Sequence, residues 1–144
     1  MTQLPAGYIL AREVPALADY QRLRDVAGLS AFAEAAARAG LPGTSFGVVV
    51  RHEDRAIGMG RVVGDGGLFF QLVDIAVEPG HQRLGIGQAI LAALLQGLAE
   101  SISAPAYVSL VADGAADRLY SRFGFGPVAP RSKGMACWLQ PSSA

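Results

Sequence analysis

The 144-residue sequence is poor in cysteine and histidine and contains no long apolar run. Cys137 is the one cysteine, which excludes an internal disulfide framework and favours a reducing, cytoplasmic location. The two histidines and the thiol stand at no spacing typical of metal ligands, so no metal is expected. No apolar stretch reaches the roughly 18 residues of a membrane span, and residues 1–10 lack the features of a secretory signal.

The sequence also lacks net charge, because 12 Lys and Arg residues balance 12 Asp and Glu residues. A neutral chain has no electrostatic footprint for nucleic acid or for an anionic membrane, so neither is expected as a partner. Apolar residues make up 51% of the chain and charged residues 17%, a composition typical of a globular protein. At this length we expect one domain, residues 1–144, that buries its own core.

The first third of the chain combines a short apolar segment with two helical patterns. Residues 7–12 are predicted to form a strand, and apolar residues at helical spacing predict a helix from Pro15 to Ala27. Ser30 is predicted to be the N-cap of a second, alanine-rich helix over residues 31–39.

The middle of the chain predicts a meander of three strands joined by tight turns. The strands are expected at residues 46–50, 56–63 and 68–77, with Gly58 and Gly60 marking a bulge or a close backbone approach. The third of these strands is almost continuously apolar, which is typical of a central strand covered on both faces.

Beyond the meander the apolar pattern becomes helical. Apolar residues recur at helical spacing from Ile86 to Leu98 and predict a helix that packs on the sheet. Residues 106–111 are predicted to form a buried parallel strand, residues 115–123 a short helix, and residues 135–139 a last strand.

A glycine-containing loop joins the meander to the long helix. Residues 73–88 read VDIAVEPGHQRLGIGQ, which predicts a strand, a turn, a short basic loop and a helix that opens on Gly85-Ile86-Gly87. The first N–H groups of a helix lack intrahelical partners and carry partial positive charge, and glycine lets a ligand approach the backbone. The loop is therefore predicted to cradle a phosphate or pyrophosphate. No Gly-Lys-Ser/Thr follows, which excludes a P-loop, and Ile90 stands where a dinucleotide fingerprint needs its third glycine.

Two motifs carry a resemblance to a known family. Gln82, Gly85 and Gly87 form a Gln-x-x-Gly-x-Gly motif that resembles the acetyl-CoA signature of the GNAT (GCN5-related N-acetyltransferase) family. Residues 119–125, LYSRFGF, resemble that family's Leu-Tyr-x-x-x-Gly-Phe element, and the resemblance covers about residues 8–138. It implies an α/β (α+β) fold with a mixed, mostly antiparallel central sheet of about six to seven strands and about four helices. It also implies that two parallel strands splay apart to form an acetyl-CoA slot.

The resemblance implies acetyl-CoA as cosubstrate. It assigns the pantetheine arm to the backbone of the strand before the loop, and a backbone N–H of that strand to the thioester carbonyl. The strand residues concerned are Ile75, Ala76 and Val77. It assigns the pyrophosphate to the loop and the first helical turn, which comprise Gln82, Arg83, Leu84, Gly85, Ile86, Gly87 and Gln88. Asp113 stands where many family members have an asparagine that bonds the pantetheine arm, and the alternative is that Asp113 is the N-cap of helix 115–123.

Tyr120 is the residue that the resemblance places near the sulfur, as general acid for the leaving thiolate. A free phenol has a pKa of about 10 and a free thiol a pKa of about 8.5, so this proton transfer is nearly balanced. The alternative is that Tyr120 packs its ring under the pantetheine and directs its hydroxyl to water.

Asp74 is the carboxylate in the apolar segment 68–77, and a buried carboxylate is costly unless it is paired. It could accept a proton from the substrate ammonium, directly or through water, or attract the cation. It could equally pair with an arginine such as Arg61 or anchor a loop through backbone N–H groups. Of the other reactive side chains, His52 is expected to be solvated, His81 to lie near the phosphate, and Cys137 to be a buried small residue.

Together these features predict an enzyme, an N-acetyltransferase for a primary amine, in which the amine attacks the thioester directly. The resemblance implies that the first two helices and the loop between them form one wall of the acceptor pocket. A small-molecule amine is favoured, since residues 60–77 are loosely similar to a bacterial and plastid branch that includes aralkylamine acetyltransferases. The alternatives are a non-catalytic acyl-CoA-binding or sensor module, and an acetyltransferase for protein N-termini or lysines. Residues 135–139 are apolar enough to require cover, and a homodimer is expected.

Overall fold

The computed structural model of the protein describes residues 3–142, which divide into an N-terminal unit that ends at Leu110 and a C-terminal unit that begins at Val111. The prediction of one domain over residues 1–144 stays a prediction.

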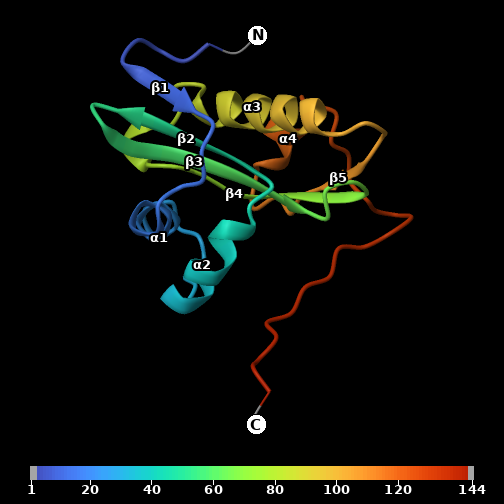
Figure 1. Cartoon of the computed structure of the whole chain (residues 1–144). Coiled ribbons are helices and arrows are strands. Elements are labelled where there is room, and N and C mark those ends of the chain that lie inside the picture. Colours follow the sequence, from blue (N-terminus) through green and yellow to red (C-terminus); the bar gives the residue numbers. More distant parts are fainter. Residues whose placement is uncertain (1–2, 143–144) are drawn as a thin grey trace. The chain divides into compact units, whose positions relative to one another are not determined.

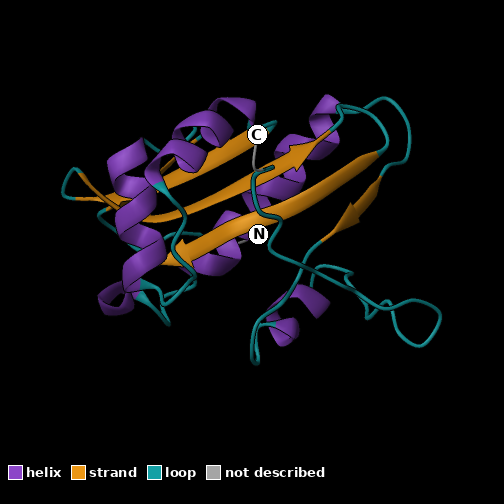
Figure 2. Cartoon of the chain, turned by 90° about the horizontal axis from the view of Figure 1, so that it is seen from below, coloured by secondary structure: helices purple, strands orange, loops and turns teal. Residues whose placement is uncertain are grey.

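A sheet is the framework of the N-terminal unit (Figure 2). Its strand order follows the chain, β1-β2-β3-β4-β5. The strands are β1 (Tyr8–Ala11), β2 (Phe46–His52), β3 (Arg55–Gly64), β4 (Phe69–Val77) and β5 (Tyr107–Ser109). The first four pair antiparallel, and β5 pairs parallel to β4. The predicted meander is thereby confirmed as β2, β3 and β4, and so is the mixed, mostly antiparallel sheet.

Helices cover both faces of this sheet (Figure 1). On one face lies α3 (Ile86–Ser101), whose buried apolar stripe is core, as predicted. On the other face lies α1 (Leu17–Val26), with α2 (Glu34–Gly40) and a 3-10 turn (Leu41–Gly43) beside it. The core under α1 and α2 contains the buried residues Tyr20, Leu23, Ala37, Leu41, Val49, Ala56, Met59 and Ala76.

Gly60 lies where α3 packs against β3. A Cβ at this position would lie 2.7 Å from Ile90 Cγ2 and 2.8 Å from Leu94 Cδ1. A glycine is therefore required for α3 to pack this closely on the sheet, which confirms the close approach expected of this segment.

A β-bulge interrupts β4 opposite the same position. Met59 pairs with Ala76 and Arg61 with Val73, so β4 contributes one more residue than β3 between these pairs. Within the bulge Asp74 adopts a left-handed φ of +59°. A bulge bends its strand and redirects the side chains around it, and here it turns a carboxylate toward the α1 face.

The second helix begins later than the sequence predicts. Ala33 is the N-cap of α2 and makes no side-chain capping bond, so the predicted cap at Ser30 is wrong. The Ser30 carbonyl instead accepts hydrogen bonds from the Arg24 guanidinium, Nε at 2.9 Å and Nη2 at 2.6 Å. The residues between Ser30 and α2 therefore form a loop held by Arg24.

The C-terminal unit contains the short helix α4 (Asp117–Ser121). The strand predicted at residues 135–139 is wrong, because residues 132–142 form no regular secondary structure. Met135 and Leu139 are 94% and 90% exposed, and this apolar segment pairs with no strand among residues 3–142. The described sheet consequently has five strands rather than six to seven. Cys137 is exposed, in contrast to the buried thiol expected.

Candidate cofactor and catalytic site

The loop before α3 passes through two left-handed residues. It follows the 3-10 turn η2 (Pro79–His81), and Arg83 has a φ of +63° and Gly85 a φ of +81°. Gly85 is the N-cap of α3, and the first helical bond runs from the Ala89 N–H to the Gly85 carbonyl at 3.0 Å. Among residues 3–142, no backbone carbonyl accepts from the N–H groups of residues 83–88. The loop and the first helical turn, residues 83–88, thus present a run of free donors. We call these residues the cradle.

These donors fit an anion. Left-handed and helical residues in succession turn their N–H groups toward a common concavity, and the helix N-terminus adds partial positive charge. Residues 83–85 are exposed, and a Cβ at Gly85 would meet no atom within 4 Å, so open space faces the glycine. The residues present therefore fit the pyrophosphate of acetyl-CoA, although its assignment to this loop stays a prediction.

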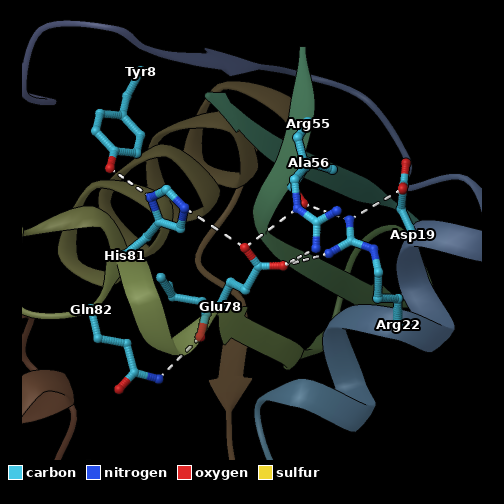
Figure 3. A network of polar contacts seen from close by, with 9 residues as sticks. Tyr8, Asp19, Arg22, Arg55, Ala56, Glu78, His81 and Gln82 are labelled. Carbon is cyan, nitrogen blue, oxygen red and sulfur yellow. Dashed lines mark hydrogen bonds and ion pairs between the residues drawn. The ribbon is translucent and has the colours of Figure 1, made fainter. Parts of the chain in front are cut away.

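Gln82 holds the loop to the end of β4. Its Nε2 donates to the Val77 carbonyl at 3.0 Å, in the close-up of Figure 3. In the structure this side chain fixes the start of the loop. A hydrogen bond of this kind orders the loop before any ligand arrives.

One backbone edge of β4 is open beside the cradle. Among the described residues, β5 pairs with β4 only over Phe69–Gln71. From Leu72 to Val77, β4 makes its ladder with β3 alone. This short pairing is the predicted splaying of the two parallel strands, and it leaves Ile75 to Val77 without a β5 partner. The binding of the pantetheine arm along this edge stays a prediction.

Asp74 accepts hydrogen bonds from three side chains on the α1 face. Arg24 Nη1 donates to Oδ1 at 2.5 Å, and Arg61 Nε and the Tyr20 hydroxyl donate to Oδ2 at 2.8 and 3.0 Å. The Asp74 side chain is 5% exposed, and those of Arg24 and Arg61 are 12% and 11% exposed. The pairing with Arg61, one of the structural alternatives to a catalytic role, is confirmed, whereas a catalytic role for Asp74 stays a prediction.

The phenol of Tyr20 stays protonated within this cluster. Burial raises the pKa of its phenol, and the charge of Asp74 raises the same pKa further. The hydroxyl therefore keeps its proton at neutral pH and donates to the carboxylate. With two guanidiniums and one phenol around a single carboxylate, Asp74 is occupied on both oxygens.

Arg24 connects this cluster to the loop between α1 and α2. Besides Asp74, its guanidinium binds the Ser30 carbonyl and lies 4.7 Å from the centroid of the Phe32 ring. The resemblance assigns this loop to a wall of the acceptor pocket. The cluster thus fixes the proposed wall to the bulge of β4.

Sequence reasoning missed Arg24 and Tyr20 as partners of Asp74. Both belong to the set of helically spaced, mostly apolar residues that predicts α1, and an arginine is unusual in such a set. A guanidinium on the buried side of a helix requires a carboxylate, and that requirement was the available signal.

Tyr120 and Asp113 lie in the C-terminal unit. The N-cap of α4 is Ala116, without a side-chain capping bond, so the alternative role of Asp113 as N-cap is wrong. The Tyr120 ring packs edge-on against Phe125 with centroids 6.2 Å apart. Burial, followed by the charge of Asp113, raises the pKa of the Tyr120 phenol, so this group remains a proton donor at neutral and mildly alkaline pH.

The two histidines lie together in the N-terminal unit. His52 ends β2, and its half-buried ring lies 4.5 Å from that of Tyr8, so it is packed on one side and only partly solvated. His81 Nδ1 hydrogen-bonds to the Tyr8 hydroxyl at 2.6 Å. Among the described residues, no three His, Cys, Asp or Glu side chains gather as metal ligands would.

No helix within residues 3–142 has the length and apolar character needed to cross a membrane.

Comparison with known proteins finds one matching family. Residues 43–127 match the model of the acetyltransferase (GNAT) domain. A solved structure from meticillin-resistant Staphylococcus aureus, described as a protein of unknown function and probable acetyltransferase, is 42% identical with a TM-score of 0.86. That match covers 92% of this chain and 99% of that chain.

More distant solved structures have the same fold. A GNAT-family acetyltransferase from Streptococcus pneumoniae is 22% identical with a TM-score of 0.74, over 94% of this chain and 99% of that one. The ribosomal-protein-S18-alanine N-acetyltransferase from Escherichia coli is 21% identical with a TM-score of 0.69, over 83% of this chain and 78% of that one. At these identities the likeness shows the fold alone. A search among curated proteins gave no match.

Proposed function

The chain belongs to the GNAT acetyltransferase family, and from this premise we propose that it transfers the acetyl group of acetyl-CoA to the primary amine of a small molecule. The observation that carries the proposal is the run of free N–H donors at residues 83–88, beside the open edge of β4. A loop of this form is suited to a pyrophosphate, and an open strand edge to an extended arm. Both features support the proposal that acetyl-CoA binds along this loop and strand.

When bound, acetyl-CoA supplies an activated acetyl group as a thioester. The chain's own part is to hold and orient it: residues 83–88 bind the pyrophosphate, and the backbone of Ile75 to Val77 pairs with the arm. A backbone N–H of this strand would also stabilise negative charge on the carbonyl oxygen as it develops.

Tyr120 is proposed to give its proton to the leaving sulfur. Burial and the charge of Asp113 raise the pKa of this phenol, so the hydroxyl is protonated at neutral pH and has a proton to give. A phenol that was ionised at neutral pH could not serve as an acid.

Asp74 is proposed to act as an anchor rather than as the base. Its oxygens already accept from Arg24, Arg61 and Tyr20, and its side chain is 5% exposed, so an incoming ammonium would have little access to it and two guanidinium charges to compete with. The amine proton would then pass to water. Asp74 contributes to acceptor binding by holding the loop that begins at Ser30.

A panel of small amines, assayed by release of free CoA thiol, tests the proposal. The expected result is amine-dependent thiol release with one class of primary amine, aromatic amines being the first to try. A protein substrate would instead give acetylated N-termini or lysines in a proteome treated with the enzyme. In that case no small amine of the panel would cause thiol release. A sensor module would bind acetyl-CoA and release no thiol with any acceptor.

Gly85→Val is expected to abolish acetyl-CoA binding while the chain stays folded. A valine at a φ of +81° is strained, and its side chain would fill the space that faces the donors. The measurement is calorimetric titration with acetyl-CoA. The matched control is Gly66→Val, which imposes similar strain at a φ of +88° in the β3–β4 hairpin, at the other end of β4. An unchanged affinity of Gly85→Val for acetyl-CoA would contradict the binding of the pyrophosphate at residues 83–88.

The chain is proposed to form a homodimer. Met135 and Leu139 are almost fully exposed in an apolar segment, and association would cover them. Light scattering at about tens of micromolar, a concentration suited to micromolar affinity, is expected to give twice the chain mass. A monomer mass throughout this range would refute the dimer.

A further inference from the structure

The turn before the cradle is tied to a distant strand by a hydrogen bond. The Tyr8 hydroxyl of β1 lies 2.6 Å from His81 Nδ1 of η2, across 73 residues of sequence (Figure 3). On the other side of the imidazole, His81 Nε2 lies 3.7 Å from Glu78 Oε2. The ring of His81 is thus held between a phenol and a carboxylate.

Glu78 fixes the beginning of the same turn. Its Oε1 accepts from Arg22 Nη1 of α1 at 2.7 Å and from Arg55 Nη2 of β3 at 2.6 Å. The hydrogen bond from Arg55, with the charges of Arg55, Arg22 and His81, lowers the pKa of the Glu78 carboxyl. Glu78 therefore remains ionised at neutral pH. Arg22 also donates to the Ala56 carbonyl at 2.6 Å, which ties the turn to α1 and β3 together.

Two rings, those of Tyr8 and His52, pack around the imidazole of His81. The centroid of His52 lies 4.5 Å from that of Tyr8 and 5.3 Å from that of His81, and Tyr8 and His81 are 5.5 Å apart. His52 ends β2, so this packing adds a further strand to those that hold the turn. The orientation of His81 is set by these rings and by its two polar neighbours.

His81 is followed directly by the cradle loop. Gln82 is fixed to the Val77 carbonyl, and Arg83 next adopts a left-handed φ of +63°, which is unfavourable for a residue with a side chain. Such a conformation persists when the surrounding structure determines it. The contacts of Glu78, His81 and Gln82 hold the chain immediately before the free N–H groups of residues 83–88. They thereby stabilise the left-handed conformation of Arg83.

We propose that Tyr8 and His81 are positioning residues for acetyl-CoA binding, which hold the cradle loop in the conformation that presents its N–H groups to the pyrophosphate. This inference rests on the proposed function. If a chain occupies the binding-competent loop conformation for a smaller fraction of the time, its apparent affinity falls by that fraction. The hydroxyl of Tyr8 acts through the imidazole and the turn, and it does not contact the ligand in this proposal.

Tyr8→Phe tests the proposal because it keeps the ring stack and removes the hydroxyl. At about pH 8, where free histidines are neutral, the variant is expected to bind acetyl-CoA about three- to tenfold more weakly, in line with the loss of one neutral hydrogen bond. Its kcat at saturating acetyl-CoA and its KM for the amine should be unchanged. In the absence of ligand, hydrogen exchange of the His81 and Ala89 amides, which donate to the Glu78 and Gly85 carbonyls on either side of the loop, should be faster than in the wild type. The matched control is Tyr107→Phe, at an exposed tyrosine of β5, where none of these quantities should change.

A double-mutant cycle tests whether Tyr8 acts through His81. In a His81→Phe background, which keeps a ring at position 81, Tyr8→Phe should cause no further loss of affinity. Unchanged affinity and unchanged amide exchange in Tyr8→Phe would overturn the proposal, as would a lower Tm with wild-type affinity. A wild-type protein that does not bind acetyl-CoA would overturn the proposed function itself. Faster exchange in Tyr8→Phe would still show the loop positioning in that case.

Discussion

Asp74→Asn is expected to destabilise the protein by about 3–5 kcal/mol, the range for removing one partner of a buried ion pair. Arg24 and Arg61 would then face an amide that carries no compensating charge, and one amide oxygen cannot accept all three of the present donors. Since a whole domain is stable by only about 5–15 kcal/mol, this loss should be evident in urea denaturation as a large fall in the midpoint.

The matched control for Asp74→Asn is Glu100→Gln. Glu100 pairs with Arg12, but their side chains are 51% and 48% exposed, and such surface pairs contribute little to stability. The anchor role of Asp74 would be contradicted by a variant with the wild-type urea midpoint that loses amine turnover most at low pH and recovers as pH rises. That result would mean that the carboxylate acts on the ammonium.

Tyr120→Phe is expected to lower kcat by about 100-fold, the low end of general acid–base contributions, because a thiolate leaves fairly well without a proton. Acetyl-CoA affinity should be almost unchanged, since phenylalanine retains the ring and its edge-on contact with Phe125. The matched control is again Tyr107→Phe, whose hydroxyl is given no role.

The pH profile of Tyr120→Phe provides a second observation. An acid works below its own pKa, and burial raises the pKa of Tyr120 above the ordinary value for a phenol. Wild-type kcat should therefore lose the Tyr120 contribution only above about pH 10. The variant should show no such decline. If Tyr120→Phe retains full kcat across the pH range, the tyrosine is structural.

The parts of the site that the sequence predicts well are those determined by neighbouring residues. The cradle depends on a strand, a turn and two glycines within residues 73–88, and the structure contains each of them in that order. The stripe of α3 and the meander were predictable for the same reason, because periodicity is a local property.

The parts that the sequence does not predict depend on distant contacts. Arg24 meets Asp74 across 50 residues and Tyr8 meets His81 across 73, and no local pattern indicates either pair. The error at Ser30 has the same origin, because the carbonyl of that residue is held by Arg24 while the helix begins at Glu34. At residues 135–139 an apolar pattern favoured a strand, but a strand also requires a neighbour, and residues 3–142 provide none.

The most direct test of the central claim is to incubate the protein with acetyl-CoA and the best amine of the panel, and to quantify free CoA thiol and acetylated amine in the same sample. We predict equal amounts of both products, formed only when protein and amine are both present, and neither product with Gly85→Val. Tight binding of acetyl-CoA without thiol release for any amine, or thiol release without acetylated amine, would contradict this prediction.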